Sequence, residues 1–124
     1  MTTQRVAAAT SIGILLLVML APSSLGETSR FKAVGCTEDP HWQPSARTIS
    51  KGDRIVWKNP TTCDHTVNAY SGRWSKTTGL APGDRTAKTF KRAGVYKFRC
   101  LTQGHSVLED GVCHGMCGRV TVAR

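Results

Sequence analysis

The sequence has no apolar stripe at helical spacing long enough to predict a helix, no internal repeat and no low-complexity linker. The missing stripe argues against a helical bundle, because a packed helix presents apolar residues every three or four positions. The missing linker and the short chain leave room for one domain only. Acidic residues are also few, with 8 Asp and Glu against 17 Lys and Arg.

The one long apolar run lies near the start of the chain, at residues 6–21, and follows a basic residue. This pattern is typical of a secretory signal peptide, which we place at residues 1–26. Ser24 and Gly26 are small enough for the cleavage site, so the mature domain is expected to begin at Glu27. An uncleaved anchor is the alternative, although the run is short for a membrane span of about 20 residues. There is no cysteine near the cleavage site, so the sequence does not indicate a lipoprotein.

The excess of basic residues predicts a strongly positive surface. The Lys and Arg residues recur along strand-like segments and do not form a continuous basic tract. This distribution is typical of a solvated outer sheet face. The alternative is electrostatic steering toward an acidic partner or an anionic surface. Nucleic acid is a poor fit for an exported chain without a binding motif.

Short runs of alternating apolar and polar residues, separated by Gly, Pro, Asp and Asn, follow the leader. Strands are predicted at 31–35, 47–50, 54–59, 64–70, 85–90, 95–100 and 118–123. Seven or eight strands in one small domain indicate an all-β protein, a two-sheet Greek-key β-sandwich over residues 27–124. His65 opens one strand and Cys100 closes another, so both side chains are expected at the same end of the sandwich.

The stretch from Cys100 to Gly118 concentrates metal-ligand chemistry, with three Cys, two His and one Met. The mature chain has five Cys, and in an oxidising compartment an odd number leaves one thiol unpaired. We assign that thiol to Cys100. A Cys at a strand end is ordinarily only a small apolar residue, but His105, Met116 and His65 complete a His2Cys set with a weak axial thioether, which selects copper. Zinc is the rival, and a thioether adds little for zinc.

Three segments resemble the small cupredoxins, of the azurin and plastocyanin class. KGDRIVWKN leading to DHTV resembles the family's strand and first His ligand, GVYKFRC its strand ending in Cys, and GMCGRVTV its Met-containing last strand. FKAVGCTEDPHWQP resembles its first strand. The resemblance spans nearly the whole mature chain. It implies one type 1 copper ion held by His65, His105, the Cys100 thiolate and, as axial ligand, Met116.

The sequence departs from the family in the loop before Met116. Ten residues separate it from His105, where the family usually has a much shorter loop. The insertion carries His114, which is therefore a rival ligand. Only Gly115 separates His114 from Met116, so the two would have difficulty reaching one ion, and His105 is the predicted ligand. His41 lies in a loop and is predicted to be a surface residue.

The other four cysteines allow three disulfide pairings. The resemblance favours two bonds, Cys36 with Cys63 and Cys113 with Cys117. The first would join adjacent loops at the metal end, and the second would brace the inserted loop. A crossed pairing of Cys63 with Cys113 or Cys117 is the alternative.

These expectations describe a secreted or extracytoplasmic protein that carries one electron between redox partners as copper alternates between Cu(I) and Cu(II). The positive charge predicts a partner with an acidic docking surface, such as a cytochrome or an oxidase, and is compatible with peripheral membrane association. A monomer without enzymatic activity is expected. The alternatives are copper buffering or delivery, an oxidase or reductase, for which the spare imidazoles are too few, and a metal-free adhesion sandwich.

Overall fold

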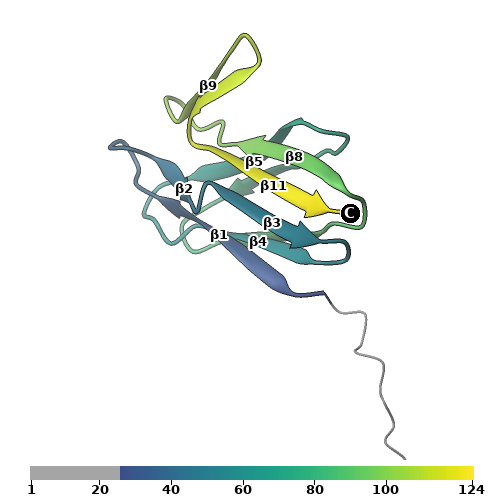
Figure 1. Ribbon diagram of the computed structural model, residues 1–124. Helices are drawn as coiled ribbons and strands as arrows, with labels where there is room; N and C mark the ends of the chain where they lie inside the picture. The colour runs from purple at the N-terminus through teal and green to yellow at the C-terminus, as the bar shows by residue number, and fades with distance from the viewer. Residues whose placement is uncertain (1–25) are drawn as a thin grey trace, which may run out of the picture.

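The computed structural model describes residues 26–124, so the predicted signal peptide lies almost wholly outside the described residues. This part of the chain forms eleven β-strands and no helix (Figure 1). No helix long and apolar enough to cross a membrane occurs within residues 26–124.

The strands form two sheets and a separate hairpin. The four-stranded sheet has the order β2 (His41–Gln43), β1 (Thr28–Val34), β4 (Arg54–Lys58), β7 (Arg85–Thr89). The five-stranded sheet has the order β3 (Ala46–Ser50), β11 (Cys117–Ala123), β8 (Gly94–Arg99), β5 (His65–Ser71), β6 (Thr77–Leu80). The hairpin of β9 (Ser106–Glu109) and β10 (Val112–Gly115) stands out from one end of the sandwich (Figure 1).

Alternating side chains build the core between the two sheets. In β4, Ile55 and Trp57 belong to the core and have no exposed surface. Phe98 of β8 lies at the centre, with its ring edge-on to those of Phe31 and Trp57 at centroid distances of 4.9 and 5.3 Å. Burying a large apolar side chain stabilises a fold by roughly 1.5–3 kcal/mol. The aromatic cluster therefore holds the sheets in one arrangement.

The prediction of an all-β sandwich is confirmed, but the count of seven or eight strands is too low. The additional strands are β2, β6, β9 and β10. β2 has three residues and β6 has four, so neither is long enough to show a clear alternation. The other two lie inside the stretch interpreted as a metal-binding loop.

One end of the sandwich gathers the residues of the predicted metal site. β1, β4 and β8 all end there, and β5 begins there with His65. Three segments cover this end, residues 35–40, 59–64 and 100–116. We call this surface the metal end.

Candidate metal centre

The free thiol of Cys100 lies between two imidazoles. Its Sγ is 3.7 Å from Nδ1 of His65 and 3.6 Å from Nδ1 of His105. All three side chains are buried, and their ligand atoms lie within 4.8 Å of one another. Cys100 is the one cysteine of the described chain outside a disulfide. The fold thus brings together three of the four predicted ligands.

Backbone hydrogen bonds fix the position of the Cys100 sulfur. The N–H of Thr66 donates to Sγ at 3.2 Å, and the N–H of Leu101 donates to the Thr66 hydroxyl at 2.7 Å. The Ser106 hydroxyl donates to the Cys100 carbonyl. An N–H directed at sulfur favours a thiolate, so these contacts suit a metal-bound Cys.

Met116 returns to the same place although ten residues separate it from His105. Its N–H donates to the His105 carbonyl at 2.7 Å, and its carbonyl accepts from the Cys100 N–H at 3.0 Å. The side chain is fully buried. Two backbone hydrogen bonds therefore tie Met116, the predicted axial ligand, to Cys100 and His105.

The β9–β10 hairpin absorbs the inserted residues. Ser106 pairs with Gly115, so the hairpin starts directly after His105 and closes directly before Met116. Asp110 and Gly111 form its turn, with positive φ angles of 51° and 76°. Asp-Gly is a strong signal for a two-residue hairpin turn, and this signal in the sequence would have predicted the hairpin.

Gly115 is required at the base of the hairpin. Its φ is +96°, and a Cβ there would clash with the His105 carbonyl oxygen at a distance of 2.4 Å. Any other side chain would push the hairpin away from His105. The close approach of the two chain segments thus depends on this glycine.

The two remaining histidines lie away from the buried thiol. His114 is on β10, and its Nε2 is 4.0 Å from a carboxylate oxygen of Glu109. His41 is partly exposed, with Nδ1 2.7 Å from the Asp39 carbonyl. The structure therefore brings His105, and not His114, to Cys100.

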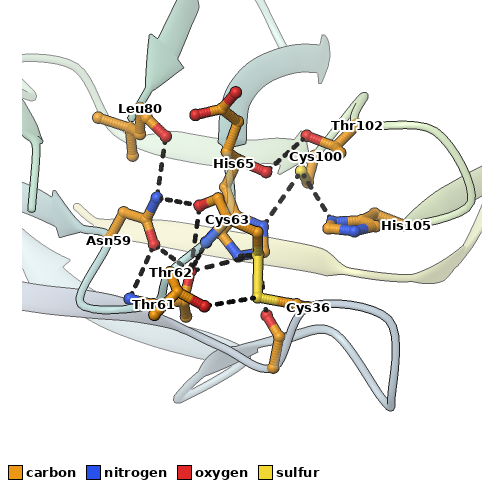
Figure 2. The surroundings of a disulfide bond; sticks show 12 residues. Cys36, Asn59, Thr61, Thr62, Cys63, His65, Leu80, Cys100, Thr102 and His105 are labelled. Atoms are coloured by element: carbon orange, nitrogen blue, oxygen red, sulfur yellow. Dashed lines mark hydrogen bonds between the residues drawn. A yellow bond between two sulfur atoms is a disulfide. The ribbon is translucent and has the colours of Figure 1, made fainter. Parts of the chain in front are cut away.

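The structure pairs Cys36 with Cys63 and Cys113 with Cys117, the pairing that the resemblance favours. The first disulfide joins segments 35–40 and 59–64 at the metal end and lies beside His65 (Figure 2). The second joins β10 to the start of β11 and closes the base of the hairpin.

Burial favours the neutral form of both imidazoles. Loss of hydration lowers the pKa of His65, and the positive charge that His105 would carry lowers it further, while the Gly35 backbone and Asp64 act in the opposite direction. Loss of hydration also lowers the pKa of His105, against a backbone contribution from Cys36. The neutral form is the one that binds a metal.

Asn59 is a structural residue of the site that sequence reasoning did not single out. Its side-chain amide donates to the carbonyls of Cys63 and Leu80 at 2.8 and 2.9 Å, and its oxygen accepts from the N–H of Thr61 at 3.0 Å (Figure 2). The side chain is almost fully buried. These bonds shape segment 59–64 and so place Cys63 against His65. Asn59 precedes a proline, and this turn signal is visible in the sequence.

Comparison with known proteins gives the fold a class. No protein-family model matches the chain, and no curated protein matches it in sequence. The structure is similar to a purple cupredoxin from Nitrosopumilus maritimus (TM-score 0.60, 20% identity, covering 77% of this chain and 99% of that one). It is also similar to a pseudoazurin from Methylobacterium extorquens, with a TM-score of 0.57 and 21% identity. This match covers 77% of this chain and 75% of the pseudoazurin. The chain has the cupredoxin fold.

An enzyme also contains this fold. A Cu-containing nitrite reductase from Thermus scotoductus matches with a TM-score of 0.60 and 20% identity. The match covers 81% of this chain but 23% of the reductase. The fold alone therefore does not decide between a carrier and an enzyme.

The donor set can be compared with what copper requires. Two neutral imidazoles, one buried thiol and one buried thioether come from His65, His105, Cys100 and Met116. Soft sulfur ligands with imidazoles suit copper in both oxidation states, whereas a structural zinc site usually has four Cys or His ligands. The site is suited to one copper ion.

Proposed function

We propose that this protein binds one type 1 copper ion and carries single electrons between redox partners outside the cytoplasm. The observation that carries the proposal is the buried cluster in which Nδ1 of His65 and of His105 lie 3.7 and 3.6 Å from the Cys100 sulfur. Met116, tied by its backbone to the same residues, would supply the axial thioether. Copper in this site would provide a one-electron Cu(I)/Cu(II) couple.

The chain's own contribution is a rigid and dry site. His65 is held on β5 and Cys100 directly after β8, two neighbouring strands of one sheet. Both side chains have no exposed surface. A site that is fixed by packing and backbone hydrogen bonds reorganises little when the charge of the metal changes, which favours fast electron transfer.

Electron exchange would take place at the metal end. His105 is 7% exposed, so only a narrow part of its ring reaches the surface. Leu101 and Val107 flank it in the sequence, and each is 48% exposed. An apolar surface beside the metal allows a partner to approach closely without removing water from charged groups.

The charges around the metal end define the partner surface that we propose. Segments 35–40, 59–64 and 100–116 contain five acidic residues and no Lys or Arg. A row of basic residues crosses the outer face of the four-stranded sheet, where Lys32, Lys58 and Arg85 are paired in register on three adjacent strands. Within residues 26–124 none of these three forms an ion pair with an acidic side chain. We propose that an acidic partner contacts this row while it covers the apolar surface.

Charge reversal tests this partner surface. Lys58→Glu with Arg85→Glu should slow electron exchange with an acidic partner and flatten its salt dependence. Lys91→Glu with Arg92→Glu makes the same change of charge on two exposed residues after β7, at the opposite end of the sandwich, and serves as the control. Equal effects of the two pairs would show that net charge, and not the row beside the metal end, attracts the partner.

Copper buffering or delivery is the second candidate function. A buried site with one thioether does not favour exchange of copper between proteins, since access to the metal is restricted. A reductase would need a further metal cluster. In residues 26–124, the one other group of suitable ligand atoms is Cys36, Cys63 and His65, and its sulfurs form a disulfide. Both disulfides fit an oxidising, extracytoplasmic location.

Copper titration and voltammetry test the proposed function. Addition of Cu(II) to protein that starts at Glu27 should saturate at one equivalent, and voltammetry should give a reversible one-electron wave. Every strand of residues 26–124 lies between Thr28 and Ala123, so this protein retains all of them. Tight copper binding without a reversible wave would favour buffering over electron transfer.

A further inference from the structure

The imidazole of His65 lies between two sulfur atoms. Its Nδ1 is 3.7 Å from Sγ of Cys100, and its Nε2 is 3.2 Å from Sγ of Cys63, which belongs to the Cys36–Cys63 disulfide (Figure 2). The ring is fully buried. The nitrogen that faces away from the proposed metal site therefore contacts a disulfide.

The chemistry of the disulfide determines which nitrogen carries the proton. A disulfide sulfur has no hydrogen, so it accepts hydrogen bonds and cannot donate them. A hydrogen bond at this contact requires the proton of neutral His65 on Nε2. Nδ1 then has a free electron pair and faces the Cys100 sulfur, as a metal ligand must.

The disulfide is itself held in place. The Thr61 hydroxyl lies 3.4 Å from the Cys63 sulfur, and the Thr62 hydroxyl lies 3.9 Å from the Cys36 sulfur. Asn59 accepts hydrogen bonds from the Thr61 N–H and hydroxyl at 3.0 and 2.6 Å. Both sulfur atoms of the disulfide thus have further polar neighbours in segment 59–64.

We propose that the Cys36–Cys63 disulfide positions His65 for metal binding, by accepting the Nε2–H and thereby fixing both the ring orientation and the tautomer. Ligating histidines usually donate their second N–H to an oxygen atom. Here a sulfur atom of a covalent crosslink is an acceptor for this N–H, beside the backbone of Gly35, which also hydrogen-bonds the ring. The disulfide thus has a role in the metal centre beyond its contribution to stability. This inference rests on the proposed function in so far as His65 binds copper.

The first experiment needs neither copper nor a variant. ¹⁵N NMR of the metal-free protein from Glu27 distinguishes a protonated from an unprotonated imidazole nitrogen, at a pH where His65 is neutral. The proposal predicts the proton of His65 on Nε2. The Gly35 backbone would also place the proton there, so the variant that lacks the disulfide decides between the two acceptors. A proton on Nδ1 would overturn it, and this result does not depend on whether copper binds.

The second experiment uses the two disulfides of the chain as a matched pair. Cys36→Ala with Cys63→Ala removes the disulfide that touches His65, and Cys113→Ala with Cys117→Ala removes the one at the base of the hairpin. Loss of the partner of a ligating histidine typically lowers metal affinity 10–100-fold. We expect this loss and a mixture of His65 tautomers in the first variant. Cys117 directly follows Met116, so the second variant is the control for the tautomer of His65 and not for copper affinity.

The outcomes separate the inference from the proposed function. If the first variant keeps the wild-type tautomer and binds copper within threefold of wild type, the disulfide is a structural crosslink only and the inference is wrong. If the intact protein binds no copper, the proposed function fails, and the NMR result still decides the hydrogen bond. If the first variant does not fold, Cys36→Val with Cys63→Val, which fills the space of the two sulfur atoms but accepts no hydrogen bond, replaces it in the same comparison.

Discussion

Gly118 is the glycine of the core whose replacement should have the clearest effect. It lies in β11 opposite Phe98 of β8, and a Cβ added there would be 2.1 Å from Cζ of the Phe98 ring. Two more ring atoms would lie 2.5 and 2.8 Å away. Phe98 cannot move aside, because the rings of Phe31, Trp42 and Trp57 pack around it. Gly118→Ala should therefore force strain into the centre of the fold.

The size of this effect follows from overpacking and backbone entropy. An extra methyl in a packed core costs about 1–3 kcal/mol. Ala gains roughly 0.4–1 kcal/mol over Gly in the unfolded state, where it has fewer conformations to lose. With three ring atoms closer than 3.0 Å, the strain is expected at the upper end. The net loss should be about 2 kcal/mol in the free energy of unfolding.

Urea denaturation followed by tryptophan fluorescence, on metal-free protein, measures this loss. Gly79→Ala is the matched control, because Gly79 also lies in a strand and a Cβ there meets no atom within 4 Å. The control should be neutral or slightly stabilising. Phe98 is two residues before Cys100, so the blue absorption of the copper form should also shift in Gly118→Ala. Equal stability of the two variants would refute the account of the core.

Two further substitutions test the site. His105→Ala should abolish the blue absorption, whereas His114→Ala should leave it unchanged, because only His105 lies beside the Cys100 thiol; loss of colour in His114→Ala alone would reverse the assignment. Asn59→Ala should lower the free energy of unfolding by about 3 kcal/mol, since it leaves buried backbone groups of segment 59–64 without partners. Urea denaturation checks this value, and a loss below about 0.5 kcal/mol would show that water replaces the amide.

The sheets and much of the candidate site could be predicted because both depend on local patterns. Alternation in Arg54–Lys58 and Gly94–Arg99 determined which side chains face the core. His65 at the start of one strand and Cys100 after the end of another had to meet once those strands became neighbours. The odd number of cysteines identified a free thiol without any structure.

The rest depended on contacts between distant segments. The spacing of His105 and Met116 alone gave no indication that their backbones are hydrogen-bonded, and only the Asp110-Gly111 turn signal pointed to the hairpin that returns the chain between them. Net charge did not show that the metal end has no Lys or Arg. The contact of the Cys63 sulfur with His65 depends on the conformation of both side chains and on a crosslink to a residue 27 positions away.

The absorption spectrum of the Cu(II) form tests the central claim most directly. Protein that starts at Glu27 should turn intensely blue with one equivalent of Cu(II), because a thiolate bound to copper in this ligand set gives a strong charge-transfer band. Cys100→Ser preserves the shape of the side chain and removes the thiolate, so it should bind copper without the colour. A colourless wild-type complex, or an unchanged blue Cys100→Ser variant, would contradict the account.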